Sequence, residues 1–373
     1  MCVYVSLVSA QAGSPDNRNP CGDTGTELAE ALVRAGHQVT VFARVDRSRQ
    51  RRTEITEGGV RLVRIPAGPQ AAVPEEELLS CRAEFAAALA KHWLRERPDI
   101  VHAQCRLGGR AAADVVRPAG VPLVQALDGP SDLALGDEVD KLIVPCSAVR
   151  QEVFRLGVPR NKVAVVPFAV DLGLFDTTVT PEPSEGLRRL VAVGDLRPQG
   201  GLETSIEALV KVPGARLVIA GGPPPAQLAT DLEAQRLREH ARQCGVADRV
   251  TLVGRVPRTA LPGLFASADV ALCTPWQDPY GQVAMGAMAC GLPVVGTSVG
   301  ALTDTVVQGV TGLLVPPRAP IAVASALRTL MRQPFNAQAL GVSGQLRAQA
   351  RYGWDRAALE TVRVYEQVIA ERG

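Results

Sequence analysis

The sequence predicts an α/β protein of two domains, each built on a parallel sheet with helices on both faces. Its 373 residues are too many for one small core and suit two domains. Short runs of Val, Ile and Leu, bounded by Gly, Pro or Asp, alternate with longer helical patterns. The polar stretch 177–186 interrupts this alternation, which then resumes, so we interpret the stretch as a linker between two α/β domains.

In the first half, strands are predicted at seven short apolar runs: 3–8, 39–43, 60–65, 99–101, 123–125, 141–144 and 163–166. Helices are predicted over 24–35, which Gly36 ends, over 75–95, between the strands at 99–101 and 123–125, and over 147–156, which Ser147 caps. We assign 1–176 to an N-terminal Rossmann-like domain that holds the acceptor side of the site.

The second half repeats the pattern. Strands are predicted at 190–194, 216–220, 250–253, 270–273 and 294–296, and helices over 202–211, 226–244, 260–266 and 281–290 and from Ile321 and Trp354. We assign 187–352 to a C-terminal Rossmann-like domain and expect 353–373 to pack as a helix toward the N-terminal domain. Parallel sheets bind ligands at the carboxyl ends of their strands, so the expected site lies between the domains.

The composition excludes several classes of protein. Forty basic against 38 acidic side chains leave a net charge of +2, which offers no electrostatic footprint for nucleic acid or an anionic membrane. Aromatic residues are only 4%, too few for a base-stacking surface. The eight cysteines are dispersed and the four histidines do not cluster, so we expect a reduced, cytoplasmic protein without a metal site. Neither a signal peptide nor a membrane span is predicted.

Several motifs together resemble those of glycosyltransferase family 4, in particular the actinobacterial enzymes of the mycothiol-pathway and sucrose-phosphate-synthase type. The densest block runs from Thr274-Pro-Trp-Gln-Asp-Pro-Tyr-Gly-Gln-Val283 through 287–295. The other matching segments are 27–41, 97–103, 121–125, 193–198, 218–222, 248–256, 268–270, 299–306 and 309–317.

The resemblance implies the GT-B fold, in which two Rossmann-like domains face each other across a cleft. It also implies a retaining, metal-independent transferase that uses a nucleoside-diphosphate sugar as donor substrate and no further cofactor. The expected partners are that nucleotide sugar and a small-molecule acceptor, with a homodimer as one possible assembly. We expect a bacterial enzyme of natural product or antibiotic biosynthesis.

The sequence departs from the family pattern at positions that carry its chemistry. The resemblance implies an arginine and a lysine on the donor diphosphate, where this chain has Asp195 and Gly200. It implies glutamates on the donor sugar and ribose, where Asp278 and Gly286 stand, and a histidine near the anomeric carbon, where Asp128 stands. The double-glycine phosphate loop aligns with Asn19-Pro20.

These positions define the candidate site. The donor-binding candidates are Asp278, Tyr280, Gly281, Gln282, Val283, Arg197, Arg255, Asp195 and Gly222. The catalytic candidates are Asp128 and His102, and the acceptor and phosphate-loop candidates are Gly22, Gly25 and Arg106.

Structural interpretations stay open beside these functional ones. Asp278 can be an ordinary cap of a helix, His102 can be a packed side chain, and Asp128-Gly129-Pro130 forms a good turn on its own. The leading hypothesis is a glycosyltransferase acting on a small specialised metabolite. The alternative is a catalytically degenerate relative that binds a ligand or an active partner, since two missing charged groups would lower a transferase rate by roughly 10⁴–10⁶-fold unless they are replaced.

Overall fold

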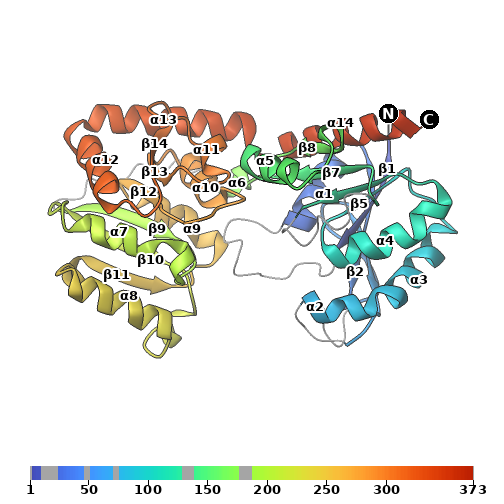
Figure 1. Ribbon diagram of the computed structural model, residues 1–373, viewed down its shortest axis with the longest axis horizontal. Helices are drawn as coiled ribbons and strands as arrows, with labels where there is room; N and C mark the ends of the chain where they lie inside the picture. Colours follow the sequence, from blue (N-terminus) through green and yellow to red (C-terminus); the bar gives the residue numbers. More distant parts are fainter. Residues whose placement is uncertain are drawn as a thin grey trace. The chain divides into compact units, whose positions relative to one another are not determined.

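The computed structural model describes residues 2–9, 24–45, 51–69, 75–127, 138–175 and 187–372. These residues form two compact α/β units. The first contains the described parts of 1–167 together with the segment from Trp354, and the second those of 168–353. Each unit has a predominantly parallel sheet between helices, which confirms the predicted fold class (Figure 1).

The first unit has an eight-stranded sheet in the order β3-β4-β2-β1-β5-β6-β7-β8. Its strands are β1 Tyr4–Ser9, β2 Gln38–Arg44, β3 Thr53–Ile55, β4 Arg61–Ile65, β5 Ile100–Ala103, β6 Leu123–Ala126, β7 Lys141–Val144 and β8 Val163–Val165. Neighbouring strands are parallel except for β3 and β4. Strand β3 was not predicted, because its three residues are largely exposed and too few for an apolar pattern.

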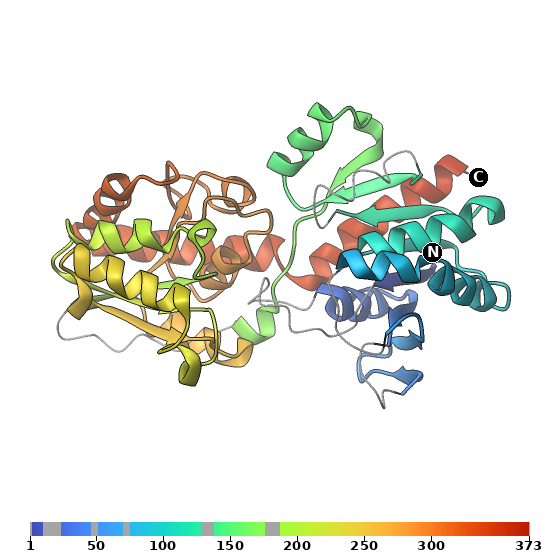
Figure 2. The ribbon, with the colours of Figure 1, turned by 60° about the horizontal axis from the view of Figure 1, so that its bottom comes forward.

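Helices cover both faces of this sheet. They are α1 Thr24–Arg34, α2 Glu75–Leu78, α3 Arg82–Trp93, α4 Arg106–Ala119, α5 Ser147–Arg155 and α14 Trp354–Arg372. Val101 and Ala103 of β5 belong to the apolar core that α3 and α4 cover. The alternate residue, His102, contacts Tyr365 of α14, which lies beside α1 (Figure 2). The last helix of the chain therefore covers the first sheet.

Two predicted helices of this unit differ in detail. A 3₁₀ turn over Leu79–Cys81 divides the helix expected over 75–95. Cys146, and not Ser147, occupies the N-cap position of α5, and its side chain makes no capping hydrogen bond. Ser147 is instead the first residue with helical geometry.

The second unit has a six-stranded parallel sheet in the order β11-β10-β9-β12-β13-β14. Its strands are β9 Arg188–Val193, β10 Ala215–Ala220, β11 Val250–Gly254, β12 Val270–Cys273, β13 Val294–Thr297 and β14 Gly312–Val315. Its helices are α6 Leu172–Phe175, α7 Leu202–Leu209, α8 Leu232–Gln243, α9 Leu261–Ala266, α10 Gln282–Ala289, α11 Leu302–Thr305, α12 Pro320–Arg332 and α13 Pro334–Arg351.

The helix predicted over 226–244 begins later than expected. Residues Pro225–Gln227 form a 3₁₀ turn, and α8 starts at Leu232. The Asp231 carboxylate accepts a hydrogen bond from the Ala234 N–H and so caps α8. Strand β14 and helices α6, α11 and α13 were not predicted.

Alternating side chains of β9 reach two separate cores. Leu190 and Ala192 pack in a core with α7, α8 and α12, whereas Val191 packs in a core with α9, α10 and α13. Figure 1 shows these helical layers on opposite sides of the sheet. The strand order reverses between β9 and β12, and in the first unit between β1 and β5. Such switch points leave a crevice at the carboxyl ends of the strands, where ligands of open α/β sheets bind.

Candidate active site

The loops that follow β9 and β12 are joined at the switch point of the second unit. A Cβ atom on Gly201 would lie only 1.9 Å from the Thr274 carbonyl oxygen, and Gly201 has a φ of +65°, so glycine alone fits there. The Thr274 hydroxyl donates to the Gly201 carbonyl at 3.0 Å and contacts the Ser205 hydroxyl at 2.8 Å. The Trp276 N–H donates to the Gln199 carbonyl at 2.9 Å. These bonds bring the two loops into one surface.

Asp195 and Arg197 form a pair within the loop after β9. Nε of Arg197 donates to Oδ2 of Asp195 at 2.7 Å, and Nη2 donates to the same oxygen. The backbone N–H of Arg197 donates to Oδ1 of Asp195 at 3.0 Å. Partial burial raises the pKa of the Asp195 carboxyl, but the hydrogen bonds from Arg197 outweigh it and lower that pKa overall. Arg197 is thus in the predicted loop, with its guanidinium bound to a neighbouring carboxylate.

Gly222 and Arg255 lie beside this loop at the ends of β10 and β11. A Cβ atom on Gly222 would lie 2.4 Å from Cδ1 of Leu196, so the absence of a side chain lets the two loops touch. The Arg255 N–H donates to the Pro223 carbonyl at 2.9 Å, and its Nε donates to the Gly222 carbonyl at 3.4 Å. The Arg255 side chain is exposed at this edge of the sheet.

Asp278 uses its carboxylate within its own turn. Oδ1 accepts hydrogen bonds from the N–H groups of Tyr280 at 3.0 Å and Gly281 at 2.7 Å. Burial raises the pKa of Asp278, although the two backbone bonds oppose that shift. This geometry supports the structural interpretation of Asp278 as a residue that shapes the turn into α10. The ring of Tyr280 packs edge-on against Phe168, with centroids 4.6 Å apart.

The N-terminus of α10 has hydrogen-bonding capacity to spare. The first N–H groups of a helix have no partner within the helix, and the N-cap residue of α10 is Gly281, which has no side chain to cap them. Gln282, the first residue of α10, is 4% exposed, and its Nε2 has no hydrogen-bond partner within the described part of the chain. Val283 follows in the same turn. Helix N-termini carry a partial positive charge, so an anionic or polar ligand would satisfy these donors.

His102, a catalytic candidate of the first unit, is packed inside that unit. His102 is 2% exposed on β5, and its Nδ1 lies 2.6 Å from the Tyr365 hydroxyl. Burial lowers the pKa of His102 to about 4, so its imidazole is neutral near pH 7. This placement agrees with the packed interpretation of His102.

The other candidates of this unit are less enclosed or lie outside the described residues. Arg106 is the first residue of α4, and its Nε is buried without a hydrogen-bond partner among the described residues. Gly25 lies in the first turn of α1. Asp128 and Gly22 lie outside the described residues.

The described residues offer neither a metal site nor a membrane-spanning helix. No group of three or more His, Cys, Asp or Glu side chains there could hold a metal ion. None of the helices described is both long enough and apolar enough to cross a membrane.

Comparison with known proteins identifies the family. Residues 25–174 match the family described as Glycosyltransferase Family 4, and residues 180–347 match Glycosyl transferases group 1. A D-inositol 3-phosphate glycosyltransferase of Mycolicibacterium smegmatis is 30% identical over 343 residues, which cover 81% of this chain and 77% of that protein. The chain belongs to the family 4 glycosyltransferases.

Further similar proteins support the same family and fold for this glycosyltransferase. The D-inositol 3-phosphate glycosyltransferase of Xylanimonas cellulosilytica is 29% identical over 415 residues, 99% of this chain and 97% of the relative. Sucrose-phosphate synthase from Thermosynechococcus elongatus superposes with a TM-score of 0.81 at 25% identity, over 99% of this chain and 100% of that structure. An Anabaena protein, HepE, solved with UDP and glucose, has a TM-score of 0.74 at 17% identity, over 98% and 100%. The fold of the glycosyltransferase is GT-B, as the motifs predicted.

Sequence reasoning missed the residues that hold the loops of this glycosyltransferase in place. Ser205 and Thr274 join the loops after β9 and β12. Arg236 of α8 donates a hydrogen bond to the Leu196 carbonyl in the loop after β9. For the Ser205–Thr274 contact, the only signal in the sequence was that Thr274 directly follows a predicted strand. Nothing local marks Arg236, because the carbonyl that it contacts lies 40 residues away in sequence.

Proposed function

We propose that this glycosyltransferase moves a sugar from a nucleoside-diphosphate donor to a small specialised metabolite, with retention of the anomeric configuration and without a metal ion or further cofactor. The observation that carries the proposal is the N-terminus of α10 beside the loop after β9, where the N-cap residue Gly281 has no capping side chain and Nε2 of the buried Gln282 has no partner among the described residues. These donors suit the phosphate and hydroxyl oxygens of a nucleotide sugar.

The reaction would break the bond between the anomeric carbon and the phosphate oxygen, and its electron pair would leave with the nucleoside diphosphate. Positive groups that meet this developing charge lower the barrier, and the loss of one such donor typically costs about 2.7–4 kcal/mol. Arg197, Arg255 and the first N–H groups of α10 are the groups that we assign to this task. Asp128, outside the described residues, would take the proton of the acceptor hydroxyl.

Similar proteins whose structures hold nucleotides or a nucleotide sugar support a nucleotide sugar as the donor. The Anabaena structures include complexes with UDP and with UDP-glucose, and a starch synthase structure from Arabidopsis thaliana holds ADP and acarbose. The curated relatives act on D-inositol 3-phosphate. A small polyol phosphate is therefore the first acceptor to test for this chain.

Calorimetric titration with UDP, GDP, ADP and dTDP sugars tests the donor. We expect one nucleotide sugar to bind with a dissociation constant in the micromolar range, as is ordinary for an enzyme substrate. The bound donor is then incubated with D-inositol 3-phosphate and other small polyols, and the product anomer is assigned by NMR, with and without EDTA. Absence of binding across the panel would overturn the proposal, and an inverted product or loss of turnover in EDTA would overturn its finer parts.

A further inference from the structure

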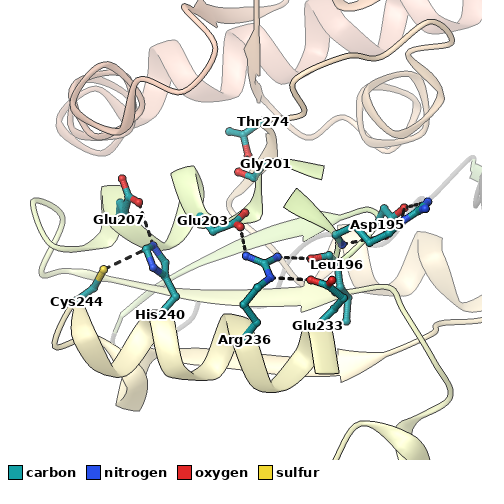
Figure 3. A network of polar contacts seen from close by, with 11 residues as sticks. Asp195, Leu196, Gly201, Glu203, Glu207, Glu233, Arg236, His240, Cys244 and Thr274 are labelled. Atoms are coloured by element: carbon teal, nitrogen blue, oxygen red, sulfur yellow. Dashed lines mark hydrogen bonds and ion pairs between the residues drawn. The ribbon is translucent and has the colours of Figure 1, made fainter. Parts of the chain in front are cut away.

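One arginine of α8, Arg236, forms a hydrogen bond to the backbone of the loop after β9. Nη2 of Arg236 donates to the Leu196 carbonyl at 2.7 Å, and its Nε donates to a carboxylate oxygen of Glu233 at 2.6 Å. Its Nη1 donates to a carboxylate oxygen of Glu203, in the first turn of α7. Figure 3 shows the guanidinium of Arg236 among these three acceptors, so one side chain joins the loop to both α7 and α8.

This contact fixes the orientation of a single peptide group. Arg236 holds the carbonyl of the Leu196–Arg197 peptide, and Oδ1 of Asp195 accepts from its N–H at 3.0 Å. The Leu196 side chain is itself buried and meets Gly222. A peptide group bonded at both ends cannot rotate without breaking a hydrogen bond to a charged group, and such bonds are stronger than those between neutral groups.

The loop held in this way carries the cation that we assign to the diphosphate. Arg197 follows the fixed peptide directly, and Asp195 precedes it. Ordering a loop and its side chains on binding costs free energy, which weakens the affinity for the ligand. A rigid loop lowers that cost before the donor arrives.

We propose that Arg236 is a positioning residue for donor binding, which holds the Leu196–Arg197 peptide so that Arg197 meets the donor diphosphate. The inference rests on the function proposed above. We assign Arg236 no contact with the donor, because each of its three nitrogens already donates to Glu233, Glu203 or Leu196.

The test measures binding of nucleoside diphosphates to the full chain by calorimetry. UDP, GDP, ADP and dTDP are titrated first into the wild-type protein, and the tightest of them serves as the probe. In Arg236→Gln we expect the dissociation constant of that probe to rise at least tenfold, with the number of sites per chain unchanged. A merely structural role would instead reduce the number of competent sites and leave the dissociation constant of the remainder as it was.

Two further variants complete the test. Arg236→Lys keeps the charge and can hold the Leu196 carbonyl with one ammonium group, so it should recover part of the lost affinity. Arg242→Gln is the matched control, since Arg242 lines the same surface hollow of α8 and pairs only with Glu239 among the described residues. Its affinity should equal that of the wild type.

The outcomes separate the two proposals. Failure of the wild-type protein to bind any of the four diphosphates would overturn the proposed function and this inference with it. Wild-type binding with an unchanged dissociation constant in Arg236→Gln would overturn the role of Arg236 alone. If Arg236→Gln does not fold, Arg236→Lys decides the question. Faster hydrogen exchange over 194–201 in Arg236→Lys would show that the loop is less firmly held. Wild-type affinity for the diphosphate in that same variant would then contradict a positioning role.

Discussion

Gly200 stands where the family resemblance implies a lysine, and the loop around it has no room for a side chain. A Cβ atom there would lie 2.0 Å from the Asp195 carbonyl oxygen. Restoring a lysine at this position would force the turn over Pro198–Gly200 apart before its amine reached any ligand. The loss of this cation is thus coupled to the tight shape of the loop.

Gly200→Ala tests this at the residue scale. We expect the free energy of unfolding to fall by about 1–3 kcal/mol, the usual cost of forcing an extra group into a filled space. Gly194→Ala is the matched control in the same loop, since a Cβ atom there would meet nothing within 4 Å. Urea unfolding monitored by circular dichroism measures both. Equal stabilities for the two variants would contradict the steric explanation.

The Asp195–Arg197 pair leads to a second residue-scale prediction. If Arg197 binds the donor diphosphate, Arg197→Ala should weaken nucleoside-diphosphate binding at least about tenfold, the loss expected for one charge-assisted hydrogen bond. Asp195→Asn should act in the opposite direction, because it removes the competing charge while an amide oxygen can still accept from the Arg197 N–H. Calorimetry gives both affinities. Weaker binding in Asp195→Asn would show that the carboxylate assists the donor and does not compete with it.

At the scale of elements, the pairing of β5 with α14 depends on a buried neutral histidine. Burial holds the pKa of His102 at about 4, against 6.5 for the free side chain. The unfolded chain therefore binds a proton that the folded chain refuses in this interval, and stability present above pH 6.5 is lost as the pH falls toward 4. A difference of about 2.5 pKa units corresponds to roughly 3 kcal/mol.

His102→Asn should remove this component of the pH dependence. We expect the free energy of unfolding of the wild type to fall more steeply between pH 7 and pH 4.5 than that of the variant, even though the variant is less stable at pH 7. Urea titrations at several pH values measure the two slopes. Parallel slopes would mean that the buried imidazole does not control acid stability.

At the scale of the whole molecule, the first unit is built from two segments that are separated in sequence by the second unit. Its last helix, α14, buries Trp354, Ala358 and Tyr365 in that unit, although 168–353 form the other. The core of the first unit therefore includes side chains from a segment that follows the second unit in sequence. Packing of 353–373 toward the N-terminal domain was expected from the sequence, but the apolar pattern alone does not say which strands the helix covers.

Truncation before Trp354 tests this packing. We expect faster hydrogen exchange in β1 and β5, because the core that α14 covers would be exposed, with β9 and β12 unchanged as an internal control. Mass spectrometry of proteolytic fragments resolves the two sets of strands. Equal changes in both units, or no change in β1 and β5, would contradict this assignment.

The sequence by itself determined the alternating elements, the parallel class of both sheets and the glycosyltransferase family, because apolar periodicity and contiguous motifs are local properties. It also predicted a candidate site at the carboxyl ends of the strands, since the carboxyl ends of parallel strands share one edge. The boundaries of α8 and the elements β3, β14, α6, α11 and α13 were missed, because turns, short elements and surface helices have weak apolar patterns.

Only the tertiary structure decided how the polar side chains of the site are used. Arg197 is bound by Asp195, Asp278 bonds within its own turn, and His102 contacts a tyrosine 263 residues away. Arg236 likewise reaches a carbonyl that no local pattern connects to it. A hydrogen bond forms only when two groups approach within about 3 Å in the right orientation, and the fold, not the spacing of residues along the chain, decides which groups do so.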